Sequence, residues 1–154
     1  MNYADRTGSF QQTRGRLEQT AGYRRIVSLF DRGSFCEIDA LSKSGDDFAE
    51  AVAGYGEIDG RPACAFSQNP DIAGGAMSKA QAYKIKKVYE LALKAGIPLV
   101  GIYDSVGGRL NEGADMLASF SGILLAANRL SGVVPQISLV LGPCVGTAAM
   151  VAAG

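Results

Sequence analysis

Apolar and polar positions along the chain form a unit that occurs twice. The first copy begins at Pro98, continues with the apolar run 99–103, breaks at the glycine-rich turn 106–108 and passes into helical spacing over 114–130. A short apolar run bounded by a proline and by glycines is typical of a buried strand in a parallel sheet. The pattern therefore predicts a strand, a tight turn and a helix, in that order.

The second copy follows the same order. An apolar run over 134–141 contains Pro135, the turn 142–147 is rich in glycine, and small residues follow over 148–154. Parallel strands joined by crossover connections bring the turns that follow them to one edge of the sheet. We therefore expect the two glycine turns to lie side by side at that edge.

The rest of the chain predicts a mixed arrangement of helices and strands. Asp59-Gly60-Arg61 between two apolar runs favours a β-hairpin, and Gly33 and Gly96 are typical of helix ends. The expected elements are a helix over 13–32, a short extended piece over 34–38, a loop over 42–47, hairpin strands over 52–58 and 62–66, a loop over 67–75 and a helix over 78–95.

Composition narrows the possible functions. The chain has 154 residues, enough for one domain with its own core, and its 15 basic and 15 acidic residues cancel, so a nucleic-acid partner is not indicated. No apolar stretch reaches the roughly 18 residues of a membrane span, and the polar stretch 1–12 lacks the apolar segment of a signal peptide. Three cysteines at irregular spacing favour neither disulfides nor a zinc site, and they fit a cytoplasmic protein.

The chain contains no histidine, so it cannot by itself form a Ser-His or Cys-His nucleophile or an imidazole metal site. Ser105 and Cys144 lie near the glycine turns, where capping or packing is the expected role. The turns can instead offer backbone N–H groups, because glycines at a strand end let amides face a phosphate, a carboxylate or an oxyanion. The simpler interpretation is that these glycines only allow tight turns.

The predicted helix over 78–95 carries five lysines: Lys79, Lys84, Lys86, Lys87 and Lys94. Such a series usually forms the solvated side of an amphipathic helix. The alternative interpretation is that one or two of these lysines meet phosphates of a ligand. Arg24 and Arg25, on the predicted helix 13–32, are interpreted as part of a solvated face.

Several segments, in register, resemble one protein family. They include Asp-Ser-Val-Gly-Gly-Arg at 104–109 and Gly-Pro-Cys-Val-Gly-Thr at 142–147. The other matching segments are 29–37, 54–62, 74–76, 112–113 and 131–137. From about Leu17 to the end, the chain resembles the N-terminal half of a carboxyltransferase subunit of biotin-dependent acyl-CoA carboxylases and decarboxylases, of the crotonase-like superfamily.

This resemblance implies an α/β fold of crotonase/Clp-like repeated ββα units with a parallel sheet. It divides the chain into an N-terminal extension, 1–16, and a carboxyltransferase N-terminal domain, 17–154. Because the end over 148–154 is apolar and uncapped, we expect the domain to be truncated after the second glycine turn. The chain would then belong to a longer protein or need another chain to cover it. An uncovered apolar face over 139–151 predicts self-association or a required partner.

The resemblance also implies carboxyl transfer between carboxybiotin and an acyl-CoA. In this family the biotin ring nitrogen takes the proton from the acyl α-carbon, so the protein needs no side-chain base and holds the thioester enolate with backbone N–H groups. The implied catalytic residues are Gly146 and Thr147 at the thioester oxygen, with Gly107 and Gly108 as a supporting site. The implied acyl-CoA-binding residues are Gly74, Gly75, Ala76, Lys79 and Lys84.

The resemblance further implies biotin as the cofactor, carried by a separate biotin carboxyl carrier protein or domain, and an acyl-CoA thioester as the substrate. The implied partners also include further copies of the chain or the remaining half of the carboxyltransferase. Neither a metal nor a nucleic acid is implied.

Three positions depart from the family pattern. The family usually has Gly-Gly-Ala where this chain has Val106-Gly107-Gly108, a second glycine at Thr147 and often an aromatic residue at Met150. Thr147 keeps its backbone N–H, although its side chain crowds the turn. Two other functions therefore stay open: a non-catalytic acyl-CoA-binding or assembly subunit, and a Clp-type hydrolase, which would need the Ser-His pair that this chain lacks.

Overall fold

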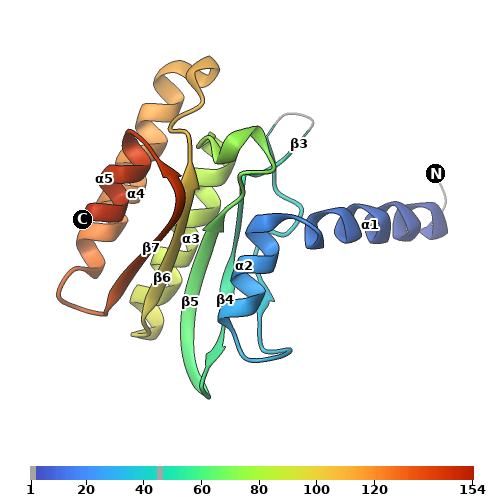
Figure 1. The fold of residues 1–154 in the computed structure, drawn as a ribbon, viewed down its shortest axis with the longest axis horizontal. Helices are drawn as coiled ribbons and strands as arrows, with labels where there is room; N and C mark the ends of the chain where they lie inside the picture. Colours follow the sequence, from blue (N-terminus) through green and yellow to red (C-terminus); the bar gives the residue numbers. More distant parts are fainter. Residues whose placement is uncertain (1–2, 45–46) are drawn as a thin grey trace.

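The computed structural model describes residues 3–44 and 47–154. Its centre is a five-stranded sheet in the order β1-β4-β5-β6-β7 (Figure 1). The strands are β1 (Cys36–Glu37), β4 (Ala51–Ile58), β5 (Arg61–Gln68), β6 (Leu99–Ser105) and β7 (Gln136–Cys144). β1, β4 and β5 pair antiparallel, whereas β5, β6 and β7 pair parallel. The predicted hairpin and the two parallel units are therefore confirmed, as is the α/β class.

Alternation along the strands gives the sheet two apolar faces. Ala51, Ala53 and Leu99 belong to one buried cluster, while Val52 and Val100, their neighbours in the chain, belong to the other. Helices α3 (Lys79–Ala95), α4 (Gly113–Leu130) and α5 (Thr147–Ala153) lie on the first face, and α2 (Ala21–Leu29) covers β4 and β5 on the second. Successive side chains of a strand point to opposite faces, which explains the division.

Helix α3 begins and ends at residues that the sequence identifies. Ser78 is its N-cap and its hydroxyl accepts a hydrogen bond from the Gln81 N–H, and Gly96 ends the helix in the left-handed conformation at φ 65°. These are the usual side-chain cap and glycine stop. Two 3-10 turns, η1 (Ala73–Gly75) and η2 (Leu110–Glu112), precede α3 and α4.

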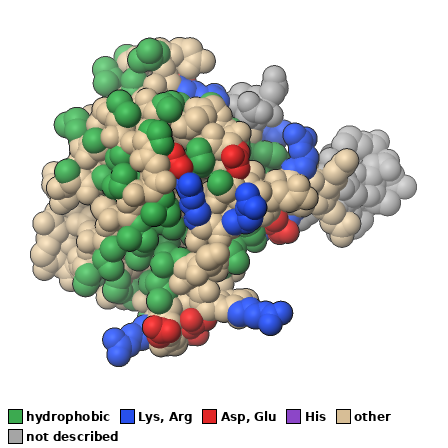
Figure 2. Space-filling model, viewed as in Figure 1, with side chains coloured by type: hydrophobic (Ala, Val, Ile, Leu, Met, Phe, Trp, Pro, Cys, Tyr) green, Lys and Arg blue, Asp and Glu red, His purple; other side chains and the backbone are tan. Residues whose placement is uncertain are grey.

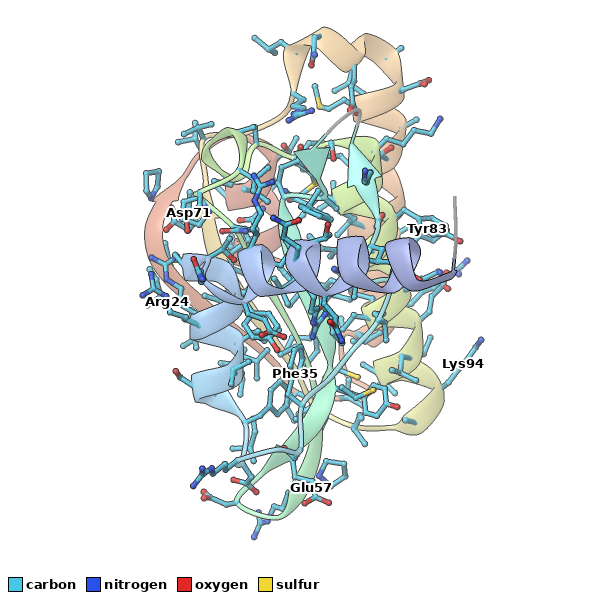
Figure 3. The ribbon with its side chains drawn as sticks, turned by 90° about the vertical axis from the view of Figure 1, so that its right-hand side faces the viewer. Arg24, Phe35, Glu57, Asp71, Tyr83 and Lys94 are labelled. Carbon is cyan, nitrogen blue, oxygen red and sulfur yellow. The ribbon has the colours of Figure 1, made fainter. Side chains whose placement is uncertain are left out.

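The N-terminal part differs from the predicted single helix over 13–32. The structure has α1 (Tyr3–Glu18) and then α2, which begins after an extended Thr20. The Thr20 hydroxyl accepts from the Tyr23 N–H, and the Asp71 carboxylate accepts from the Ala21 N–H at 2.6 Å. Side-chain capping of this kind favours a helix start over continuation. Figure 3 shows Asp71 and Arg24 on the same side of the molecule, near the junction of the two helices.

The predicted loop over 42–47 is also partly wrong. Strands β2 (Lys43–Ser44) and β3 (Asp47–Phe48) pair antiparallel in a small second sheet, while residues 45–46 lie outside the described residues. These two-residue strands are too short to give a hydrophobic period, so the sequence pattern could not indicate them.

Strand β7 runs three residues further than the predicted 134–141, to Cys144.

Strand β7 is at the edge of the sheet and is largely exposed in this chain, contrary to the expected buried strand. Ile137 is 48% exposed, Val140 55% and Leu141 53%, and Val145 and Met150 beyond the strand are similarly exposed. Figure 2 shows hydrophobic side chains gathered over β7 and the adjoining strands. The expected uncovered apolar face is therefore confirmed. None of the described helices is long and apolar enough to cross a membrane.

Candidate functional site

The first glycine turn follows β6 and is held by its own side chains. The Gly107 N–H donates to the Ser105 hydroxyl oxygen at 3.1 Å, and the same hydroxyl lies 3.3 Å from the Gly107 carbonyl oxygen. Gly107 has φ +109°, a conformation that L side chains rarely adopt. A Cβ on Gly108 would lie 2.5 Å from the Met116 sulfur on α4, so this turn approaches the helix closely.

The loop before α3 runs alongside this first turn. The Met77 N–H donates to the Gly107 carbonyl at 2.7 Å, and the Arg109 N–H donates to the Met77 carbonyl at 2.9 Å. Gly75 has φ +68°, and a Cβ at this position would overlap the carbonyl oxygen of Asp104. Only glycine permits this approach, so the loop with Gly75 and the first glycine turn form one unit.

The second glycine turn lies directly beside the first. The Val145 N–H donates to the Ser105 carbonyl at 3.2 Å, and a Cβ on Gly107 would be 3.5 Å from the Val145 carbonyl oxygen. Gly146 has φ +60° and ψ −124° and is the residue before α5, whose first residue is Thr147. The predicted meeting of the two turns at the carboxyl edge of the sheet is thus confirmed.

The N–H groups of the four predicted catalytic residues are not equivalent. That of Gly107 is occupied by Ser105. Those of Gly108, Gly146 and Thr147 have no hydrogen-bond partner within residues 3–44 and 47–154. The first N–H groups of any helix have no intrahelical acceptor, which accounts for Thr147. Three amides at one sheet edge can therefore donate to a ligand.

The loop that carries Gly74, Gly75 and Ala76 borders a cavity of about 250 Å³ between α1, β3 and the stretch before η1. Apolar side chains line it together with one basic, one acidic and one hydroxyl side chain. The lining residues are Arg16, Leu17, Thr20, Phe48, Asp71, Ile72 and Ala73. The cavity is therefore a concave surface of mixed polar and apolar character beside this loop.

Lys79 is at the start of α3, with an exposed side chain. Its Nζ lies 3.4 Å from a carboxylate oxygen of Asp115, and both side chains are about 70% exposed. Its backbone N–H donates to the Glu112 carboxylate at 2.7 Å. Together with the Ser78 cap, Glu112 satisfies N–H groups at this helix start, so the ammonium group is what Lys79 can offer a ligand.

Lys84 lies on another side of the same helix. Its Nζ is 2.8 Å from the Glu37 carboxylate, both side chains are under 5% exposed, and Arg14 binds the other Glu37 oxygen at 2.6 Å. Burial lowers the pKa of Lys84, while Glu37 opposes the shift. The structure does not bring Lys84 together with Lys79, and the solvated-face interpretation is wrong for this lysine.

Two polar groups beneath the turns were not identified from the sequence. Glu50 is fully buried and contacts Ser78 and Arg109. The only sequence signal for it is a lone acidic residue within the apolar run 49–53. Burial raises the pKa of the Glu50 carboxyl, although the Ser78 hydroxyl and Arg109 oppose the shift.

The second missed group is an ion pair between Arg25 of α2 and Asp104 of β6, at 2.6 Å. A Cβ on Gly142 would overlap the Asp104 carboxylate, so β7 leaves room for it. The strands shift register here, since Tyr103 pairs with Val140 but Ser105 pairs with Cys144. The expected solvated role is therefore wrong for Arg25, and 79 residues of separation gave no local signal.

The two candidate nucleophiles are poorly placed for that role. Ser105 is fully buried and its hydroxyl caps the first turn. Burial raises the pKa of the Cys144 thiol, which lowers the fraction of reactive thiolate. No cluster of three or more His, Cys, Asp or Glu side chains suited to a metal ion occurs in the described part of the chain.

The geometry agrees with the comparison to known proteins. The model of the carboxyl transferase domain family matches residues 11–154, so the chain belongs to this family. It is 43% identical to the methylmalonyl-CoA decarboxylase subunit alpha of Veillonella parvula, covering 80% of this chain and 26% of that protein. It is also 43% identical to the propionyl-CoA carboxylase beta chain of Saccharopolyspora erythraea, covering 80% of this chain and 24% of that one.

Solved structures show the same fold. The chain superposes on a crystal structure of the transcarboxylase 12S hexamer with hydrolysed methylmalonyl-coenzyme A bound, with a TM-score of 0.92 and 30% identity. The match covers 99% of this chain and 35% of that one. The resemblance identified from the sequence is therefore confirmed, and the chain spans about a quarter of the length of the curated relatives it matches.

Proposed function

We propose that this chain forms the acyl-CoA side of a biotin-dependent carboxyltransferase. The observation that carries the proposal is the pair of adjacent glycine turns, whose Gly108, Gly146 and Thr147 amides are free to donate. Amides fixed in this way stabilise charge on a thioester oxygen when the enolate forms. No side-chain base is required of this chain, which fits the lack of histidine.

Within the proposal, Gly146 and Thr147 bind the thioester oxygen. Gly108 donates the supporting hydrogen bond, while Gly107 shapes the turn. Carboxybiotin, brought by a separate carrier protein, supplies the carboxyl group and the base. Each amide that is lost would raise the barrier by about 2.7–4 kcal/mol.

The coenzyme A portion is proposed to lie along the loop at Gly74, Gly75 and Ala76. The cavity of about 250 Å³ beside this loop and the exposed ammonium of Lys79 support that placement. Lys84 stays in the proposal only as a support of α3, because its ammonium is bound to Glu37.

A site formed with another chain, or with the other half of a carboxyltransferase, is proposed for the biotin side. The exposed Val140, Leu141 and Met150 near the second turn support a partner at this edge.

We further propose that residues 17–154 form the carboxyltransferase domain and that residues 1–16 are an extension. We also propose that the protein acts in the cytoplasm, because its three free cysteines fit a reducing compartment.

Two assays test the function. Thermal shift and calorimetry with acetyl-, propionyl- and methylmalonyl-CoA should show binding by the chain alone. A carboxyl-transfer assay with biotinylated carrier should show turnover only when the remaining carboxyltransferase half is added. Binding without turnover in the completed complex would favour the alternative, a non-catalytic acyl-CoA-binding or assembly subunit. Turnover by a clean monomer unaided would contradict the divided site.

A further inference from the structure

A fully buried carboxylate lies beneath the first glycine turn. Glu50 is the residue before β4, and it is 0% exposed. One carboxylate oxygen accepts a hydrogen bond from the Ser78 hydroxyl at 2.5 Å, and the other lies 2.9 Å from Nε of Arg109. Its own carbonyl accepts from the Gln81 side chain and from the Asn69 N–H, each at 2.9 Å. Both ends of Glu50 are therefore fixed.

The two partners of this carboxylate continue directly into the site. Ser78 follows Met77, whose N–H binds the carbonyl of Gly107, and Arg109 follows Gly108. Since the Arg109 N–H returns to the Met77 carbonyl, Glu50 closes a ring of contacts around the loop and the turn. Such a closed ring can hold the unpartnered Gly108 amide in one direction.

Burying the charge of Glu50 has a free-energy cost that the surrounding residues must offset. A buried carboxylate costs free energy unless it is paired, and Arg109, with a side chain 19% exposed, supplies the pairing charge. Glu112 is the other charged group that acts on Glu50, and it is repulsive. A purely apolar residue could fill the same space without this cost, so the carboxylate points to a role that needs Arg109 held in place.

We propose that Glu50 is a positioning residue of the acyl-CoA site, which acts through Arg109 to fix the direction of the Gly108 amide. The inference rests on the proposed function, because it assigns that amide to the bound thioester. Glu50 itself touches neither substrate nor cofactor.

Amide hydrogen exchange tests the positioning without any ligand. In Glu50→Gln, which keeps the shape but removes the charge, exchange at Gly107 and Arg109 should rise about tenfold or more, as expected when a buried ion pair is lost. The amide of Val145, a residue of the second turn, donates to the Ser105 carbonyl at the end of β6; it serves as the internal reference and its exchange should not change. Equal protection at Gly107 and Arg109 in parent and variant would overturn the proposal.

A double-mutant cycle on acyl-CoA affinity tests the coupling to the site. Glu50→Gln and Arg109→Gln should each weaken binding about tenfold, and the double variant should be no worse than either, because the two residues act as one device. Additive losses would overturn the proposal. Arg109→Gln breaks the same ion pair at the partly exposed partner, so it still tests the proposal if Glu50→Gln does not fold.

The matched control is Glu57→Gln, an exposed glutamate on the same hairpin, which should leave exchange and affinity unchanged (Figure 3). Failure of the two hypotheses is distinguishable. If the parent binds no acyl-CoA, the proposed function is wrong. If the parent binds and Glu50→Gln binds equally well, only the role of Glu50 is wrong.

Discussion

The two glycine turns have the same sequence order but opposite surroundings. The first is enclosed: its Gly107 amide binds Ser105, its Gly108 packs on Met116, and the loop at Met77 pairs with it. The second is open, since a Cβ on Gly146 would meet no atom of residues 3–44 and 47–154 within 4 Å. A repeated motif in the sequence has therefore produced one supported turn and one turn with free space around it.

The difference indicates why glycine is present in each turn. At Gly75 beside the first turn, glycine prevents an overlap with backbone, a steric reason. At Gly146, the described residues give one reason for glycine, the φ of +60°. The open space beside it also leaves room for a ligand to approach the backbone. Glycine in open space at a strand end is what a ligand-binding turn requires, and this makes the second turn the better candidate for direct contact with the thioester.

The largest expected effect is at the open turn. Gly146→Val should reduce carboxyl transfer in the completed complex by about a hundredfold to a thousandfold, because a β-branched residue resists φ +60° and redirects the amide. Unfolding should stay cooperative. Gly132→Val is the matched control, since Gly132 also has positive φ and open space but precedes strand β7, whereas Gly146 follows it. Full turnover in Gly146→Val would remove the oxyanion assignment.

The next effect concerns the strand that leads into the open turn. Gly142→Ala should destabilise the chain by about 1–3 kcal/mol, since the added Cβ would displace the Asp104 carboxylate from its pairing with Arg25. Urea unfolding measures this change. Gly122→Ala, in α4 with its nearest contact at 3.8 Å, should be neutral or stabilising. A neutral Gly142→Ala would mean that the ion pair does not support this turn.

A smaller effect is expected at the start of α3, on the enclosed side. Lys79→Gln should weaken acyl-CoA binding severalfold and flatten its dependence on salt, because exposed charges are screened by ions. Lys94→Gln, at the far end of the same helix (Figure 3), is the control. Titration calorimetry at two salt concentrations measures both. If the acyl-CoA affinity of the parent and of Lys79→Gln depended on salt equally, the coenzyme A phosphates would not bind at Lys79.

The smallest effect should come from the enclosed turn itself. Gly108→Ala brings a Cβ to within 2.5 Å of the Met116 sulfur, but a methionine side chain adapts at small cost, so stability should fall by less than about 1 kcal/mol. Turnover should stay within a few-fold of the parent, because the backbone hydrogen bonds that hold this turn involve Met77, Gly107 and Arg109 and do not require a glycine at position 108. A loss as large as that of Gly146→Val would show that the two turns are equivalent.

Features that repeat over many residues could be predicted from the sequence. The apolar runs, the Asp-Gly hairpin and the glycine stop at Gly96 predicted the β4–β5 hairpin, the adjacent parallel strands β6 and β7 and the helices that precede each of these two strands. The split at Thr20 was missed because the carboxylate that helps to cap α2 belongs to Asp71, far along the chain. Local patterns contain no information about such partners.

The site was predictable in the same uneven way. The meeting of two glycine turns follows from parallel topology and was found. The burial of Lys84 was not, because helical spacing indicates only a charged position, and its partner Glu37 lies on a two-residue strand. Glu50 and Arg109 likewise come together only through the fold, since their positions are 59 apart along the chain.

Helix α1 extends away from the rest of the molecule and is fastened near its last turn (Figure 1). Arg14, just before the last turn, shares the Glu37 carboxylate with Lys84 and lies over the Tyr23 ring. The buried Leu17 adds a second contact at the same end of the helix. Limited proteolysis should therefore remove the outer part of α1 without loosening the sheet. Glu37→Gln, by contrast, would weaken the attachment of α1 through Arg14 and leave Lys84 as a buried charge without its ion-pair partner.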